Sequence, residues 1–356
     1  MRDTEVERKE GRNVSIDVLK GVAAFLVVLG HFVAGKEEYH RLFNFIYSFH
    51  MPLFMFLAGY TAVLSYRHST GTGNYLAKRF VNIMVPYLFW IVGAELVMEG
   101  SFGRVDWRRI AADTLIGNKV YWFLPTLYGL IIGYVCYCRI RRGICKLSGW
   151  QAAQEGIRTL IDAVSCVCVV GIFAALMFLT KLQVCRDIVG FTIPFFAAVM
   201  YVEHKWVHEL LHHRVTAVAA ILVLLLLIGK FDFNRAGLVT SLLRMILGMC
   251  AVVILLQLCE RVHMPKWAVG TLAFWGRNSL MIYLLPNWIL GYGRWLDIPH
   301  FGAIGMQVWY GVVAVWVCIV RNLLSEGLSR IPVVKMLAVG KTRGILKLNV
   351  TKGGGR

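Results

Sequence analysis

Long apolar runs alternate with short polar segments along almost the whole chain. Many of the runs approach the roughly 20 residues that an α-helix needs to cross the hydrocarbon core of a bilayer. Because a helix satisfies its own backbone hydrogen bonds in lipid, runs of this length predict membrane-spanning helices. We expect ten of them, near residues 14–34, 43–65, 80–98, 120–138, 159–180, 186–202, 215–231, 237–258, 269–292 and 303–321.

Composition and charge support this class. Apolar residues make up 58% of the 356 residues and only 16% are charged, which excludes an ordinary soluble domain. The excess of 38 basic over 20 acidic residues lies mainly in the two ends and in alternate loops, so the positive-inside rule places both termini in the cytoplasm. We predict an all-α polytopic membrane protein with a cytoplasmic tail (1–13), a membrane domain (14–325) and a basic cytoplasmic segment (326–356).

The first predicted span carries three ionisable side chains. Asp17, Lys20 and His31 interrupt its apolar run, and ionisable groups inside a membrane span are costly and usually functional. Lys20 and His31 are 11 residues apart, about three helical turns, so they lie on nearly the same face and roughly 16 Å apart along the axis. A cation near one membrane surface and an imidazole deeper in the span suit a long ligand with an anionic head, such as coenzyme A.

Several motifs together resemble the membrane acyltransferase-3 family. The first is Asp17-x-x-Lys20, followed after ten further residues by His31-Phe32. Lys at the position of Lys20 resembles the pattern of the family's fucose-acetyltransferase-like branch. Further matching segments are FHMPLFMFLAGY (49–60), KRFVNIMVPYLFW (78–90), YWFLPTLYG (121–129) and GRNSLMIYLLP (276–286). The chain departs from the family pattern at Asn82, where a second Arg commonly follows Arg79, and this weakens the nucleotide clamp expected there.

The resemblance implies an O-acyltransferase of a bacterial inner membrane. Such an enzyme transfers an acyl group, usually acetyl, from cytoplasmic acyl-CoA to a hydroxyl of an envelope sugar or a lipid-linked precursor, and it needs no metal. His31 is then the expected general base, with Asp17 and His50 as further catalytic candidates. The expected acyl-CoA-binding residues are Lys20, Lys78, Arg79, Arg244, Arg277 and Asn278.

Several of these residues also have a structural interpretation, which for His31 is a core histidine bonded to a neighbouring helix. Lys20 can extend to the lipid headgroups with Asp17 as its partner. The positive-inside rule alone can explain the basic residues near position 79. His50 precedes Pro52, which would kink the helix and free a carbonyl for the imidazole to bind.

Two other functions are open on the sequence. Intramembrane charges and a kinked helix also describe a transporter, although no internal repeat is visible. His208-Glu209-Leu210-Leu211-His212 matches the zinc-protease pattern, in which two histidines bind metal and the glutamate activates water. This motif falls in a short loop at the membrane edge, so we rank it below the acyltransferase. The acceptor sugar, the acyl group and the oligomeric state do not follow from the sequence.

Overall fold

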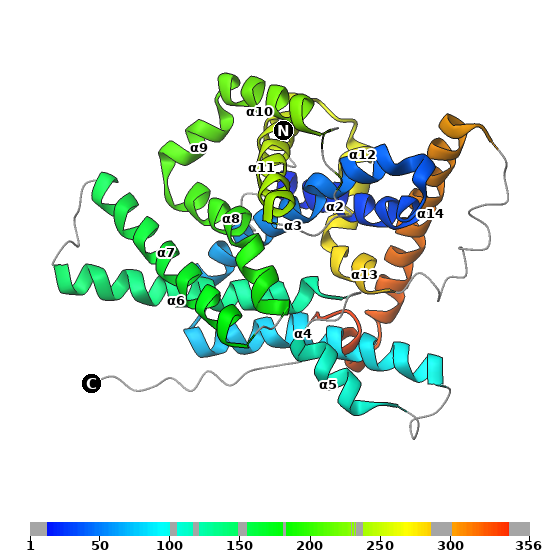
Figure 1. Ribbon diagram of the computed structural model, residues 1–356. Coiled ribbons are helices and arrows are strands. Elements are labelled where there is room, and N and C mark those ends of the chain that lie inside the picture. The colour runs from blue at the N-terminus through cyan, green and yellow to red at the C-terminus, as the bar shows by residue number, and fades with distance from the viewer. Residues whose placement is uncertain are drawn as a thin grey trace. The chain divides into compact units, whose positions relative to one another are not determined.

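The computed structural model describes residues 13–99, 105–116, 121–148, 155–180, 183–228, 230, 232, 238–285 and 301–341. Within these ranges every regular element is a helix and no strand occurs, which confirms the predicted all-α class (Figure 1). The early elements are α2 (Val14–Val33), η1 (Glu37–Tyr39), α3 (His40–Arg67), α4 (Thr72–Glu99), α5 (Trp107–Ile116), α6 (Phe123–Ser148) and α7 (Glu155–Thr180). They are followed by α8 (Gln183–Glu203), α9 (Lys205–His212), α10 (Arg214–Leu227), α11 (Leu238–Arg261), α12 (Lys266–Arg277), α13 (Ser279–Leu284), α14 (Ala303–Leu328) and α15 (Pro332–Leu337).

Eight helices in the described ranges are long and apolar enough to cross a membrane, and the pair α9–α10 makes a ninth if it is one bent span. Eight of the predicted spans coincide with these helices, and the predicted span 215–231 lies largely in α10. The remaining predicted span, 269–292, is interrupted at Asn278, where α12 ends and the short α13 begins. Its continuation beyond Leu285 lies outside the described residues.

The chain divides into two compact units. The first unit comprises residues 1–58 and 193–326, and the second comprises residues 59–192 and 327–356. Their boundaries fall within helices α3, α8 and α14, so these helices contribute to both units.

In the first unit, α2 and α12 touch backbone to backbone. A Cβ atom added to Gly21 of α2 would lie 2.0 Å from the carbonyl oxygen of Leu272, and one added to Gly276 would lie 1.8 Å from that of Asp17. Small residues at a helix crossing permit this close approach in membrane proteins. The contact brings the end of α12 to the beginning of α2.

In the second unit, polar contacts join α6 to α7 and α4 to the segment after α15. Asp162 of α7 is fully buried and its Oδ1 lies 2.7 Å from Nε of Arg141 on α6. The indole Nε1 of Trp90 on α4 donates to the carbonyl of Ala338, just after α15 (3.0 Å). These contacts fix the ends of α4, α6 and α7 within this unit.

Candidate active site

The general-base candidate His31 lies in the last turn of α2. Its side chain is exposed, yet its imidazole is surrounded by protein and lies within electrostatic reach of Arg321 and His50. An exposed imidazole at this position is accessible to a small molecule.

His50 of α3 faces the same place and is only 4% exposed. Its Nδ1 lies 2.8 Å from the carbonyl oxygen of Ile46, and because a carbonyl can only accept, Nδ1 carries the proton. In neutral His50 the lone pair is therefore on Nε2. The imidazole does bind a backbone carbonyl, as the structural interpretation proposed, but this carbonyl is not the one at Ser48 that Pro52 frees.

Tyr47 and Arg244 complete this group of side chains. The Tyr47 ring stands edge-on to the His50 ring, and the ring centroids are 4.8 Å apart. A Cβ atom added to Gly30 of α2 would lie 3.0 Å from the Tyr47 ring. Arg244 of α11 lies within electrostatic reach of both Tyr47 and His50. We call His31, Tyr47, His50 and Arg244 the histidine site.

Pro52 brings α11 close to this site. A Cβ atom on Gly248 would lie 2.3 Å from the Pro52 ring, so α11 packs directly on the proline of α3. Arg244 stands one helical turn before Gly248 and therefore lies near His50. The contact between the proline and the glycine explains how a cation from a distant span reaches His50.

Arg321 of α14 is a further cation near His31. It is 2% exposed, and its guanidinium donates to the carbonyl of Ile282 in α13. A buried arginine fixed in this way is a permanent positive charge beside the imidazole.

The other candidates on α2 gather at its opposite end. Asp17 is buried in the first turn of α2, about 21 Å along the helix axis from His31, so the structure does not bring these two together. Lys20 is partly buried one turn further along. The α2–α12 contact places Arg277 near this end, exposed, with its guanidinium carbon 5.8 Å from the centroid of the Phe274 ring.

Asn278 has structural contacts at this end. It is 3% exposed, its amide nitrogen donates to Glu326 (3.3 Å), and its amide oxygen accepts from the Ser325 hydroxyl (3.3 Å). It therefore ties the break between α12 and α13 to α14.

Lys78 and Arg79 belong to the second unit, at the start of α4. Lys78 is exposed, while Arg79 is partly buried and donates to the Ser65 hydroxyl of α3. The guanidinium carbon of Arg79 lies 5.4 Å from the centroid of the Tyr75 ring. Arg79 is thus ordered by neutral groups of its own unit.

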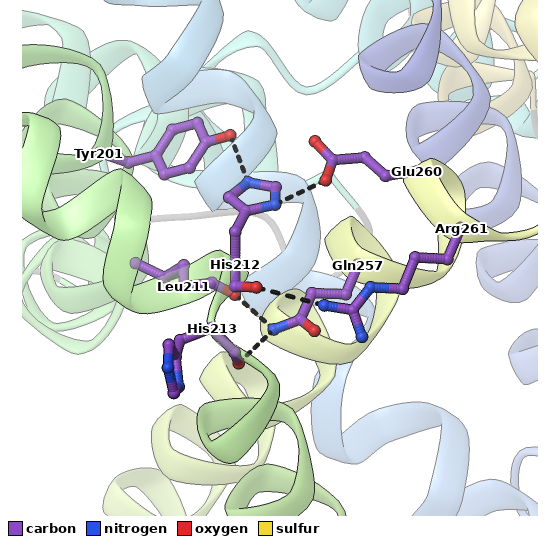
Figure 2. Close-up of polar contacts among 7 residues, drawn as sticks. All are labelled: Tyr201, Leu211, His212, His213, Gln257, Glu260 and Arg261. Atoms are coloured by element: carbon purple, nitrogen blue, oxygen red, sulfur yellow. Dashed lines mark hydrogen bonds and ion pairs between the residues drawn. The ribbon is translucent and has the colours of Figure 1, made fainter.

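The zinc-protease motif does not have the geometry of a metal centre. The Nε2 atom of His212 lies 2.9 Å from the Tyr201 hydroxyl, and its Nδ1 atom lies 2.8 Å from the Glu260 carboxylate (Figure 2). Both ring nitrogens therefore have hydrogen-bonding partners. Glu209 pairs with Lys205 (3.4 Å) in solvent. In the described part of the chain, no group of three or more His, Cys, Asp or Glu residues could hold a metal ion.

The same region instead fixes a corner between α9 and α10. The Gln257 amide nitrogen of α11 donates to the carbonyls of Leu211 (2.7 Å) and His213 (3.0 Å), and Arg261 donates to that of His212 (3.3 Å) (Figure 2). The bonds to Leu211 and His212 satisfy carbonyls that the 61° bend releases from helical pairing, whereas the His213 carbonyl also accepts the Ala217 N–H.

Tyr47 and Arg321 are the residues of this region that the sequence does not indicate. Tyr47 stands in an apolar aromatic stretch, where a tyrosine is typical of a packed core. Arg321 is the last residue of the final predicted span, where the positive-inside rule already predicts basic residues. The only sequence signal for Arg321 is its charge, which it shares with the other basic residues near the C-terminal end.

Known proteins resemble parts of this chain. Over 132 residues it is 33% identical to nodulation protein NolL of Sinorhizobium fredii, a match that covers 32% of this chain and 33% of that protein. Over 161 residues it is 35% identical to nodulation protein NolL of Mesorhizobium japonicum, covering 41% of this chain and 40% of that protein. The matched region thus spans a third to two fifths of these relatives. No solved structure matches the chain.

The comparison with protein families covers far more of the chain. Residues 13–322 match acyltransferase family 3, which is described as an acyltransferase domain. The match includes the histidine site, both ends of α2 and the start of α4. Together with the apolar helices it identifies a multi-pass membrane protein. The chain belongs to the membrane acyltransferase-3 family, as its motifs predict.

Proposed function

We propose that this protein is an O-acyltransferase that moves an acyl group, in the first place acetyl, from acyl-CoA to a sugar hydroxyl of an envelope polysaccharide or lipid-linked precursor. The family supports acyl transfer, and the histidine site supports the chemistry. The observation that carries the proposal is the accessible imidazole of His31 beside the buried His50 and the cation Arg244. The proposed location is the inner membrane of a bacterial cell.

His31 acts as the general base in this mechanism. The acceptor hydroxyl oxygen attacks the carbonyl carbon of the thioester, its proton passes to a ring nitrogen of His31, and a carbon–oxygen bond forms. The carbon–sulfur bond then breaks, and the CoA thiolate leaves and recovers the proton from His31. A positioned base of this kind contributes about 10²- to 10⁴-fold to the rate.

Arg244 and His50 support the same step. The guanidinium of Arg244 stabilises the negative charge that develops on the thioester oxygen during attack. His50 keeps Nε2 as an acceptor because Ile46 holds its other nitrogen as a donor. That acceptor orients either the incoming hydroxyl or the Tyr47 hydroxyl.

The anionic part of the donor is held by basic side chains away from this site. Lys20 and Arg277 lie at the opposite end of α2, about 16 Å along the axis from His31 in the case of Lys20. This span suits the distance between the diphosphate and the thioester of an extended acyl-CoA. Lys78 and Arg79, which belong to the second unit, are proposed as donor-binding residues on their sequence motif alone.

The direct test is the envelope chemistry of cells with and without the protein. We expect mass spectrometry of purified envelope glycans to show an added O-acyl ester only when the intact gene is present. Mild alkali should remove this group, because esters hydrolyse and amides do not. Identical glycan spectra in both strains, with the protein shown in the membrane, would reject the proposal.

Donor binding should depend on the charges that we assign to it. In purified protein, Lys20→Ala and Arg79→Ala should each weaken acetyl-CoA binding roughly tenfold, the effect of losing one charged hydrogen-bond partner. Lys20→Arg should bind normally because it keeps the charge. The matched control is Arg41→Ala, an exposed arginine at the start of α3, which should bind like the wild type. Unchanged affinity in both test variants would show that these residues do not bind the donor, and the positive-inside rule would then explain their presence.

A further inference from the structure

Ring contacts hold Tyr47 of α3 on more than one side. Its ring stacks on the Phe43 ring, with the centroids 4.0 Å apart and the planes at 25°, and it stands edge-on to the His50 ring. The His50 ring is itself held by the carbonyl of Ile46. All of these residues belong to the first unit. Packing therefore fixes the orientation of the Tyr47 ring within that unit.

The close approach of Tyr47 to α2 depends on Gly30. A Cβ atom at this position would lie 3.0 Å from the Tyr47 ring and 3.2 Å from the Ile46 side chain, closer than ordinary van der Waals contact. Glycine therefore lets the ring lie against the backbone of α2, at the residue that precedes His31. The Tyr47 ring is thus placed next to the chain at His31 and in contact with His50.

The Tyr47 hydroxyl has no hydrogen-bond partner among the residues that the structure describes, although the side chain is partly buried. Tyrosine hydroxyls that are removed from solvent usually find a partner. Other partly buried tyrosines follow this rule: the Tyr66 hydroxyl accepts from Arg142 (3.0 Å), and the Tyr201 hydroxyl lies 2.9 Å from Nε2 of His212. Tyr47 therefore presents a fixed hydrogen-bond donor to a bound molecule.

The charge beside Tyr47 indicates which kind of group this donor suits. The Arg244 guanidinium lies within electrostatic reach of both the Tyr47 hydroxyl and the His50 ring. The contact between Gly248 and Pro52 places Arg244 there. A cation and an O–H donor in one neighbourhood favour an oxygen atom that develops negative charge during a reaction.

We propose that the Tyr47 hydroxyl donates a hydrogen bond to the carbonyl oxygen of the acyl thioester and forms, with Arg244, the oxyanion site of the transfer reaction. This assignment rests on the proposed function, because it requires a thioester donor and His31 as the base. Tyr47 is then a catalytic residue, since its hydroxyl touches a reacting atom. Nε2 of His50 remains an acceptor for the incoming sugar hydroxyl.

Tyr47 takes part in the reaction without losing its proton. As the acceptor oxygen attacks, its proton passes to His31, a carbon–oxygen bond forms, and an electron pair of the carbonyl double bond moves onto the carbonyl oxygen. The Tyr47 O–H bonds this negative oxygen. When the double bond forms again, the carbon–sulfur bond breaks, and the leaving thiolate takes the proton from His31. A donor that is already oriented needs no reorganisation at this moment, so it stabilises the transition state more than water does.

The test replaces Tyr47 by phenylalanine, which removes the hydroxyl oxygen and keeps the ring. The assay measures CoA thiol release from acetyl-CoA, with alkali-treated envelope glycans of the same cells as the acceptor. We expect Tyr47→Phe to lower kcat by about 10²- to 10³-fold, the effect of removing one oxyanion-site donor. The Kd of acetyl-CoA, the KM of the glycan and the thermal unfolding midpoint should stay at their wild-type values, because the lost bond is strongest in the transition state.

Tyr128→Phe is the matched control. Tyr128 is also partly buried, but its hydroxyl donates to the carbonyl of Leu76 (3.5 Å) and it lies outside the histidine site. This variant should transfer at the wild-type rate.

The outcomes separate this assignment from the proposed function. Wild-type kcat in Tyr47→Phe would overturn the oxyanion role and leave the proposed function intact. A higher KM for the glycan at unchanged kcat would also overturn it, because the hydroxyl would then bind the acceptor. Weaker acetyl-CoA binding together with a lower unfolding midpoint would assign Tyr47 a structural role instead. A wild-type protein that binds acetyl-CoA and transfers nothing to the glycans would reject the proposed function and this assignment with it.

Discussion

His31→Ala should lower acyl transfer by about 10²- to 10⁴-fold, the contribution of a positioned general base. His31 lies within electrostatic reach of His50, and its imidazole is the exposed one of these two histidines. The measurement is the release of CoA thiol in membranes that contain acceptor, or the ester content of the glycan product. The variant should bind acetyl-CoA with the wild-type affinity, because Lys20 at the other end of α2 is unchanged.

A matched variant separates the role of this histidine from a general effect of losing an imidazole. His263→Ala removes an exposed histidine from the segment between α11 and α12 and should leave transfer unchanged. His31→Gln keeps polarity and similar size, yet it should be as inactive as alanine because an amide is not a base. Transfer close to the wild-type rate in either His31 variant would contradict the mechanism.

Gly276→Ala should destabilise the protein by about 3 kcal/mol, the upper range for overpacking in a tightly packed core. The new methyl group would lie 1.8 Å from the carbonyl oxygen of Asp17, so α2 and α12 must move apart. Since α2 carries both Lys20 and His31, donor binding and transfer should fall with stability. The measurement is the thermal unfolding midpoint of purified protein, followed by acetyl-CoA binding.

Gly270→Ala on the same helix is the matched control. Nothing lies within 4 Å of a Cβ atom at Gly270, so alanine meets open space there. Replacing glycine by alanine within a helix should then stabilise it by up to about 1 kcal/mol. The same substitution six residues away should therefore raise the free energy of unfolding, whereas Gly276→Ala should lower it. Equal stability of the two variants would mean that α2 and α12 are not in backbone contact.

The helices were predictable because lipid allows few alternatives. An apolar run of about 20 residues must satisfy its backbone within itself, so length and composition locate spans such as α2, α7 and α11. The interruption at Asn278 was not predictable from local pattern. Its side chain bonds Glu326 and Ser325, which lie almost 50 residues further along the chain, and no local rule indicates such partners.

The site was predictable where one helix carries its residues, and not where several helices meet. Lys20 and His31 share α2, so helical spacing alone relates them. Tyr47 and Arg321 join the region only through tertiary packing, and each has an ordinary local explanation.

The fixed corner between α9 and α10 has a consequence for the surrounding membrane. The 14 residues of α10 extend about 21 Å, whereas the hydrocarbon core is about 30 Å thick, and straight α7 with 26 residues is long enough to exceed it. Gln257 and Arg261 hold the corner, so α10 cannot lengthen by straightening into α9. If α10 crosses the membrane alone, local thinning of the bilayer would match its length, and lipids with shorter acyl chains should then be preferred beside it.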